Sequence, residues 1–234
     1  GYPTRVQGSS TLLLQDCAPN AQHVKLVFPA RDNMPKVAMP EVEVHWYDGG
    51  MMPDRPEGFP QGKELMGEGG GLCIFHGTKD TLICGCYGVN PWLLSGRKPN
   101  VPQTLRRVKD AMKGGHEQDW IRACKESAGS RVQTKSNFLE AGPFNEMVVM
   151  GVLATRLSGL QGLHRELMWD GENMKFTNIS PSDKIKLVTV DEYKVIDGDP
   201  RFDRRFAEFN ALDMANEWIK HTYQNGFSLP DMPR

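Results

Sequence analysis

Two kinds of hydrophobic periodicity follow one another along this chain of 234 residues. Residues 4–15 are rich in β-prone side chains, and apolar and polar residues alternate with period two in 23–30 and 39–47, which is typical of β-strands. Residues 71–88, GLCIFHGTKDTLICGCYG, predict a hairpin with its loop at 77–80. Strands that come first and helices that come later favour an α+β fold. A doubly wound parallel sheet would need strands and helices in regular alternation.

The second half of the chain has helical spacing. Residues 116–128 carry an apolar stripe, and 142–159 are apolar nearly all round, which predicts a buried helix. A last amphipathic helix is expected over 206–224, after a hairpin that turns at Asp170-Gly171. The fold that we predict is a large, mostly antiparallel, open sheet with helices packed on one face.

The balance of charge excludes several classes of partner. Lys plus Arg is 28 and Asp plus Glu is 29, so the formal net charge is -1. No run of like charge stands out, and we therefore expect no nucleic-acid surface and no anionic-membrane surface. The longest apolar stretch, 147–154, is far below the roughly 20 residues that cross a bilayer, so no membrane span is predicted.

The five cysteines leave the redox compartment open. Their odd number and the lack of a CxxC spacing argue against a disulfide framework and against a structural zinc site. In the predicted hairpin Cys73 lies opposite Cys84, with Cys86 on the same face. We favour buried thiols that pack as small apolar groups. A bridge between Cys73 and Cys84, or a bound metal, stays the alternative.

The motifs that would supply a phosphate loop, a metal site or a nucleophile are missing from the sequence. The glycines at 67 and 69–71 precede a strand instead of joining a strand to a helix, and no Gly-Lys-Ser/Thr follows them. No two of the six histidines stand three to five residues apart, so there is no local metal pair. A Gly-x-Ser-x-Gly elbow is also absent. We therefore predict no catalytic residue and no metal ligand in this chain.

The strand expected within 39–47 runs into an aromatic and glycine-rich ending, WYDGG at 46–50. One interpretation is a strand end whose aromatic residues cap the core, followed by ordinary turn chemistry. The other is a sugar-binding surface, where an aromatic ring packs on the C–H side of a sugar and a carboxylate binds its hydroxyls. The residue types alone leave both interpretations open.

Strand alternation divides this ending between the two interpretations. Trp46 continues the apolar face of the strand and is expected to belong to the core. His45 and Tyr47 point to the other face, and we expect Asp48 beside them at the polar end. The candidate substrate-binding residues are therefore His45, Tyr47 and Asp48.

Six stretches of the chain occur in a familiar order, namely WYDGGMMPDRP, GGGLCIFHGTKDTLICGCYGVNPWLL, HEQDWIRACKE, KSNFLEAGPFNEMVVMGVLATRL, LMWDGENMKFTN and ANEWIKHTYQNGFSL. Together they resemble the C-terminal domain of bacterial Gfo/Idh/MocA-type oxidoreductases, the family of glucose–fructose oxidoreductase and inositol dehydrogenase. The subgroup resembles one common in Bacteroidetes. The resemblance extends from Gly1 to about Leu229.

The resemblance implies what this chain contributes and what it lacks. In the family an N-terminal Rossmann domain holds NAD(P) and carries a Glu-Lys-Pro motif with a catalytic lysine. Neither Gly-x-Gly-x-x-Gly nor Glu-Lys-Pro occurs in these residues. We expect residues 1–234 to be a single substrate-binding and oligomerisation domain without a cofactor of its own. Asn137, in the stretch KSNF, is a secondary candidate for contact with the sugar-like substrate.

Two functions from different classes remain. The first is a piece of an NAD(P)-dependent oxidoreductase that moves hydride between a nicotinamide and a carbon of a sugar or polyol. The start at Gly1, without Met, favours a piece of a longer protein with its own Rossmann domain. The second is a free-standing carbohydrate-binding or scaffold protein. We expect the isolated chain to bind no NAD(H) and to form a homo-oligomer through its sheet face, in the bacterial periplasm or cytoplasm.

Overall fold

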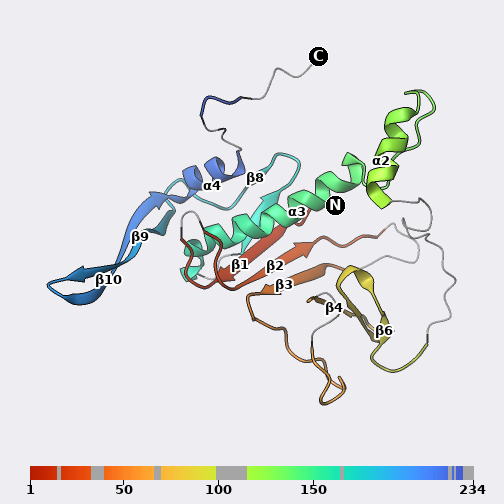
Figure 1. The fold of residues 1–234 in the computed structure, drawn as a ribbon, viewed down its shortest axis with the longest axis horizontal. Helices are drawn as coiled ribbons and strands as arrows, with labels where there is room; N and C mark the ends of the chain where they lie inside the picture. Colours follow the sequence, from red (N-terminus) through yellow and green to blue (C-terminus); the bar gives the residue numbers. More distant parts are fainter. Residues whose placement is uncertain are drawn as a thin grey trace. The chain divides into compact units, whose positions relative to one another are not determined.

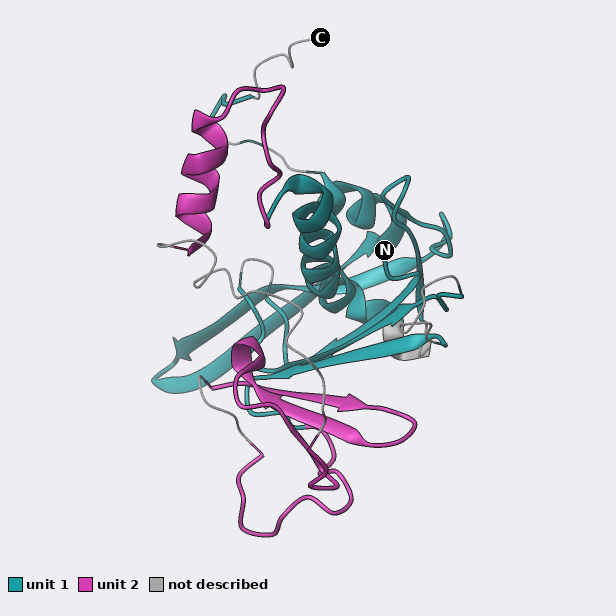
Figure 2. Cartoon of the chain, turned by 90° about the vertical axis from the view of Figure 1, so that its right-hand side faces the viewer, with its two compact units in different colours: residues 1–52, 136–234 teal, residues 53–135 magenta. Residues whose placement is uncertain are grey.

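A computed structural model describes residues 1–14, 17–32, 40–65, 70–98, 115–163, 166–220, 223 and 225–228. Two of the six histidines, at 164 and 221, and two of the clustered glycines, at 67 and 69, lie outside these residues. The chain divides into two compact units, where the sequence predicts one domain. Unit 1 is formed by residues 1–52 and 136–234, and unit 2 by residues 53–135 (Figure 2).

Unit 1 is built on a five-stranded sheet with the order β3-β2-β1-β7-β8. All neighbours in this sheet pair antiparallel. The strands are β1 (Arg5–Ser10), β2 (Gln22–Phe28), β3 (Val42–Asp48), β7 (Leu167–Asp170) and β8 (Lys175–Phe176). The α+β class and the mostly antiparallel open sheet are thereby confirmed.

One long helix, α3 (Phe138–Arg156), packs over β1 and β2 (Figure 1). It begins four residues before the predicted start, because the Asn137 side chain caps it. The core between helix and sheet includes Val6, Val24, Met150 and other buried apolar side chains. The helix was expected to be buried all round. In the structure only the side that packs on the sheet is buried, although the outward side is apolar too. The outward side chains of Phe144, Val148 and Val152 are 65%, 52% and 51% exposed.

A close approach of backbones fixes how α3 lies on the sheet. Gly8, in the middle of β1, faces the backbone of Ala154 and Thr155 near the helix C-terminus. A Cβ atom on Gly8 would lie 2.7 Å from the Ala154 carbonyl carbon and from the Thr155 nitrogen. Only glycine therefore lets helix and strand approach this closely.

The C-terminal part of unit 1 differs from the sequence prediction. Residues 206–210 continue a strand, β10 (Asp199–Asn210), which pairs antiparallel with β9 (Lys184–Ile196) in a separate two-stranded ribbon. The helix expected over 206–224 is described only as α4 (Ala211–Ile219). The prediction was wrong over 206–210 because those residues are paired with β9 along the ladder, a contact that local spacing does not show.

Unit 2 contains the predicted hairpin. Its strands β4 (Leu72–His76) and β5 (Thr81–Gly85) form a three-stranded sheet with β6 (Trp92–Leu93), and Cys73 lies opposite Cys84. The thiol of Cys84 is buried as expected, but Cys73 is exposed, and both are free. The same unit carries η1 (Cys86–Gly88) and helix α2 (Gly115–Lys125). Among the helices that the structure describes, none is long and apolar enough to cross a membrane.

Candidate functional site

The face of the unit 1 sheet that points away from α3 carries three stacked rings. Antiparallel pairing places His23 of β2 directly opposite Tyr47 of β3. The rings of His23 and Tyr47 stack with centroids 4.5 Å apart, and those of His23 and His45 with centroids 5.2 Å apart. The Nε2 atom of His23 lies 2.9 Å from Nδ1 of His45. We call His23, His45 and Tyr47 the ring row.

Charged side chains surround the ring row on the same face. The Glu43 carboxylate lies 3.2 Å from Nε2 of His45 and 4.0 Å from the Lys25 ammonium. Lys25 also pairs with Glu166 at 2.7 Å. The ring row thus has a hydrogen-bond acceptor beside it, the Glu43 carboxylate, and a donor, the Lys25 ammonium. Ion pairs hold both side chains in place.

The electrostatics of the row keep its central ring neutral. Burial lowers the pKa of His23 below its ordinary value of 6.5, and the charges of His45 and Lys25 lower it further. A neutral imidazole has one N–H donor and one acceptor nitrogen. At neutral pH His23 can therefore exchange one hydrogen bond with His45 and keep its other ring nitrogen for a further partner.

Asp48 lies on the opposite face from the ring row. Alternation along β3 puts it with Trp46, whose Nε1 donates to the Asp48 carboxylate at 3.0 Å. The backbone N–H of Gln22 and its side-chain amide also donate to this carboxylate, at 3.2 and 2.9 Å. The side-chain Oε1 of Gln22 in turn accepts a hydrogen bond from the Thr155 hydroxyl of α3 at 3.0 Å. The structure therefore places Asp48 in a structural network that ties the sheet edge to the helix.

We expect Asp48→Asn to destabilise unit 1 by about 1–2 kcal/mol, because it weakens the hydrogen bonds that the Asp48 carboxylate accepts from Gln22 and Trp46. Burial alone would raise the pKa of Asp48, but the hydrogen bonds from Gln22 and Trp46 lower it. A carboxylate with a lowered pKa stabilises the fold above its unfolded-state pKa, and this stabilisation is lost as the pH falls through the lowered value. Urea unfolding at pH 7 and pH 3 measures both effects.

The matched variant for Asp48→Asn is Asp54→Asn, at an exposed carboxylate. Equal unfolding free energies for the wild type and Asp48→Asn at pH 7 would contradict the structural role of Asp48. A difference between the two proteins that grows, instead of shrinking, between pH 7 and pH 3 would contradict the direction of the pKa shift.

Trp46 is not part of the core, contrary to the prediction. Its side chain is 62% exposed. The physical reason is the width of α3: a helix is about 10 Å across, and strands lie about 4.8 Å apart, so one helix covers two strands. The helix packs over β1 and β2 and leaves the apolar side of the edge strand β3 uncovered.

Asn137 stands apart from the other candidate residues. Its Oδ1 accepts hydrogen bonds from the backbone N–H groups of Leu139 and Glu140, at 3.0 and 3.3 Å, as the N-cap of α3. Thr155, which reaches toward β3 through Gln22, is 18 residues further along the same helix. At about 1.5 Å per residue the two positions are roughly 27 Å apart. The structure thus brings together His45 and Tyr47, but neither Asp48 nor Asn137 joins them.

His23 is the member of the ring row that was not predicted from the sequence. The alternation of the strand at 23–30 puts His23 on the polar face. It does not tell which residues of β3 lie beside His23, because that depends on the register between the two strands. Among the residues that the structure describes, no three His, Cys, Asp or Glu side chains are grouped so that they could hold a metal ion.

A hollow elsewhere in unit 1, away from the ring row, has a different chemistry. Its volume is about 500 Å³, and it is lined along α3 mainly by apolar and aromatic side chains, among them Leu139, Trp169 and Trp218. The one carboxylate in it, Glu146, accepts a hydrogen bond from Nε1 of Trp169 at 2.8 Å. With its acid already bonded, this hollow offers few free polar groups to a sugar.

Comparison with known proteins does not assign the chain to a family. No protein-family model matches the chain, and no curated protein matches it. The chemistry of the site is therefore argued from its residues.

Proposed function

We propose that this chain is the substrate-binding and oligomerisation part of an NAD(P)-dependent oxidoreductase that acts on a sugar or polyol. The observation that carries the proposal is the ring row on the helix-free face of the sheet, with Glu43 and Lys25 beside it. The antiparallel sheet with helices on one face is also the architecture that the resemblance to Gfo/Idh/MocA-type enzymes implies.

The chemistry of the ring row suits a ligand with several hydroxyl groups. The Tyr47 hydroxyl and the second ring nitrogen of His23 can donate or accept hydrogen bonds, whereas both nitrogens of His45 are bonded already, to His23 and to Glu43. A carboxylate and an ammonium beside them can bind further hydroxyls. This differs from the aromatic surface that the sequence suggested, because the rings face one another and the ligand would be held by hydrogen bonds at their edges.

Redox chemistry in this proposal belongs to a nicotinamide held by a partner Rossmann domain, which supplies or accepts the hydride. The described residues bind and orient the substrate. The ring row holds hydroxyls, and the charged pair of Glu43 and Lys25 fixes the position of His45.

Calorimetric titration of the chain with myo-inositol, D-glucose and NADH tests the proposal. We expect saturable binding of at least one of the two polyhydroxy compounds and no binding of NADH. His45→Ala should weaken polyol binding at least about tenfold, because His45 holds His23 and Glu43 in position through its two ring nitrogens. His76→Ala, at an exposed histidine of unit 2, is the matched control and should bind as the wild type does.

Two results of this titration would contradict the proposal in different ways. If His45→Ala and His76→Ala bind the polyol equally well, the ring row is not the binding site. Micromolar affinity of the unaltered chain for NADH would mean that the nicotinamide site is here and not in a partner domain.

The alternative is a free-standing carbohydrate-binding or scaffold protein. The ring row favours it as well, because hydroxyl binding at this face needs no nicotinamide. The coding sequence upstream of Gly1 separates the two. A strand, glycine-rich loop and helix encoded there support the oxidoreductase, and a start codon directly before Gly1 supports the alternative.

A further inference from the structure

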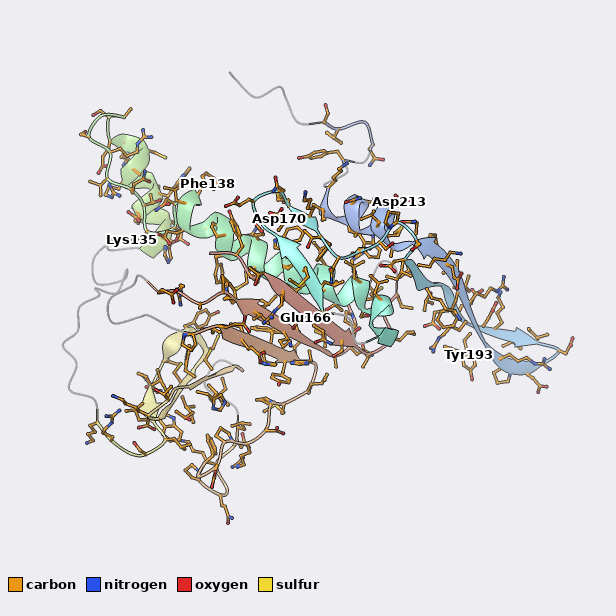
Figure 3. The ribbon with its side chains drawn as sticks, turned by 180° about the vertical axis from the view of Figure 1, so that it is seen from behind. Lys135, Phe138, Glu166, Asp170, Tyr193 and Asp213 are labelled. Atoms are coloured by element: carbon orange, nitrogen blue, oxygen red, sulfur yellow. The ribbon has the colours of Figure 1, made fainter. Side chains whose placement is uncertain are left out.

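Three of the five cysteines gather on the hairpin of unit 2, whose ribbon is pale yellow in Figure 3. Cys73 lies in β4 and Cys84 in β5, and the register places these two residues directly opposite each other. Cys86 follows the end of β5 and is near enough for its charge to act on Cys73. The hairpin thus brings three thiols together.

The hydrogen bonds of the ladder show which kind of pair Cys73 and Cys84 form. The N–H of Cys86 donates to the Gly71 carbonyl at 3.1 Å, two positions along the same register. Hydrogen-bonded pairs recur at every second position of an antiparallel ladder, so Cys73 and Cys84 are such a pair. The Cα atoms of such pairs are about 5.5 Å apart, which is close to the commonest distance in disulfides. The backbone therefore holds the two thiols where a disulfide can join them.

The two thiols differ in their access to solvent. Cys73 is exposed, whereas Cys84 is only 6% exposed. A reagent in solution can therefore reach Cys73 first. Both thiols are free in this structure, which shows the pair in its reduced form.

The surroundings of Cys73 set how fast it reacts. Partial burial raises the pKa of Cys73, and the neighbouring Cys84 and Cys86 raise it further. The thiolate is the nucleophile in thiol–disulfide exchange, and below the pKa its fraction grows about tenfold per pH unit. Cys73 should therefore react slowly at neutral pH and faster in mildly alkaline solution.

We propose that Cys73 and Cys84 are a reversible redox pair, which closes into a disulfide on reaction with a low-molecular-weight disulfide. In the first step the Cys73 thiolate attacks one sulfur of the reagent. A new S–S bond joins Cys73 to one half of the reagent, and the S–S bond of the reagent breaks. The other half leaves as a thiolate and takes up the proton that Cys73 has lost.

The second step takes place within the chain. The Cys84 thiol loses its proton, and its sulfur attacks the Sγ atom of Cys73. The bond between Cys73 and the reagent breaks, and the second half leaves as a thiol with that proton. The reagent is reduced to two thiols, and the cysteine pair loses two electrons. Because β4 and β5 hold the two sulfurs close together, this step is intramolecular and outpaces attack by a second reagent molecule.

The register also explains why this pair closes and the other cysteines do not. Cys86 lies opposite Gly71, which has no side chain. Diagonal neighbours in a ladder are about 7–8 Å apart, so Cys86 is too far from Cys73 for a bridge. Cys124 is exposed on α2 and should keep a bound half of the reagent as a mixed disulfide. The redox pair lies in unit 2 and does not rest on the proposed function.

Incubation of the full chain with oxidised glutathione, followed by alkylation of free thiols and peptide mass spectrometry, tests the inference. Trypsin cleaves after Lys79, between the two cysteines, so a bridge joins two peptides. We expect Cys73 linked to Cys84 without glutathione on either residue, and glutathione on Cys124. Dithiothreitol should restore both thiols. The rate of closure should rise about tenfold from pH 7 to pH 8, as the thiolate fraction of Cys73 grows.

Variants of the two thiols near Cys73 separate their roles. Cys84→Ala keeps a small apolar side chain at this buried position, and it should leave glutathione on Cys73 as a stable mixed disulfide. Cys86→Ser is the matched control, since it removes the other neighbouring thiol and should close as the wild type does. Circular dichroism shows whether each variant is folded, and the result for the wild type stands without them.

Three results would overturn the inference. One is a wild-type chain in which Cys73 keeps its glutathione and no bridge forms. Another is a Cys73 that stays unmodified after Cys124 has reacted. The third is a bridge that forms at the wild-type rate in Cys84→Ala, because Cys86 would then be the partner of Cys73.

Discussion

Replacing Trp169 by alanine should cost unit 1 about 3–5 kcal/mol of unfolding free energy. Trp169 is 5% exposed, and its ring packs edge-on against Phe176 with centroids 4.9 Å apart. The substitution opens a large cavity and removes the donor that Glu146 accepts at 2.8 Å. Thermal melting followed by circular dichroism should show the transition of unit 1 lowered by roughly 10 °C.

Trp46→Ala is the matched control for this variant. The same side chain is removed from the same unit and the same sheet, but Trp46 is 62% exposed. We expect a loss below about 1 kcal/mol, mainly from the hydrogen bond to Asp48. Equal losses for both tryptophans would contradict the division of the sheet into a covered centre and an uncovered edge.

Gly8→Ala should destabilise unit 1 by up to about 3 kcal/mol, a large effect for one methyl group. The added Cβ would lie 2.7 Å from backbone atoms of Ala154 and Thr155, which cannot rotate away as a side chain could. Helix and strand must separate, and the core between them loses contacts. Urea unfolding gives the change in free energy.

Gly142→Ala is the control for the glycine prediction. Gly142 lies inside α3, with no atom within 4 Å of an added Cβ. Alanine is the better helix former, so this variant should gain about 0.5–1 kcal/mol. If Gly8→Ala is as stable as the wild type while Gly142→Ala gains stability, the close contact of α3 with β1 is not present in solution.

Much of the fold was predictable because its local patterns agree with its long-range contacts. The strand at 23–30 alternates cleanly, and β2 lies within it. The hairpin at 71–88 pairs in the predicted register, with Cys73 opposite Cys84. The apolar helix at 142–159 is present, although its cap at Asn137 extends it toward the N-terminus.

The failures have a common cause in contacts between distant residues. Phe206 and Phe209 have a spacing that fits a helix, but in the structure they pair with Val188 and Ile185 in a strand ladder. Trp46 has the alternation of a core residue, but the helix that would cover it reaches only the two neighbouring strands. Periodicity states which face a residue occupies and does not state what lies on that face.

The candidate site was predictable in part for the same reason. Alternation alone puts His45 and Tyr47 on the polar face, and the structure agrees. His23 joins them only through the register of β2 and β3. Asp48 follows Tyr47 in the sequence, so it falls on the other face, where it bonds Gln22 and Trp46.

NMR of the histidine side chains can show whether the ring row binds the hydroxyl groups of a sugar or polyol, as we propose. Signals of the imidazole C–H groups are assigned with single His→Gln variants, and the chain is titrated with myo-inositol and with D-glucose at pH 7.5. We expect the His23 and His45 signals to move together and to saturate with one dissociation constant, while those of His76 and His116 stay in place. Saturation that moves His76 or His116 and leaves His23 and His45 unchanged would contradict it.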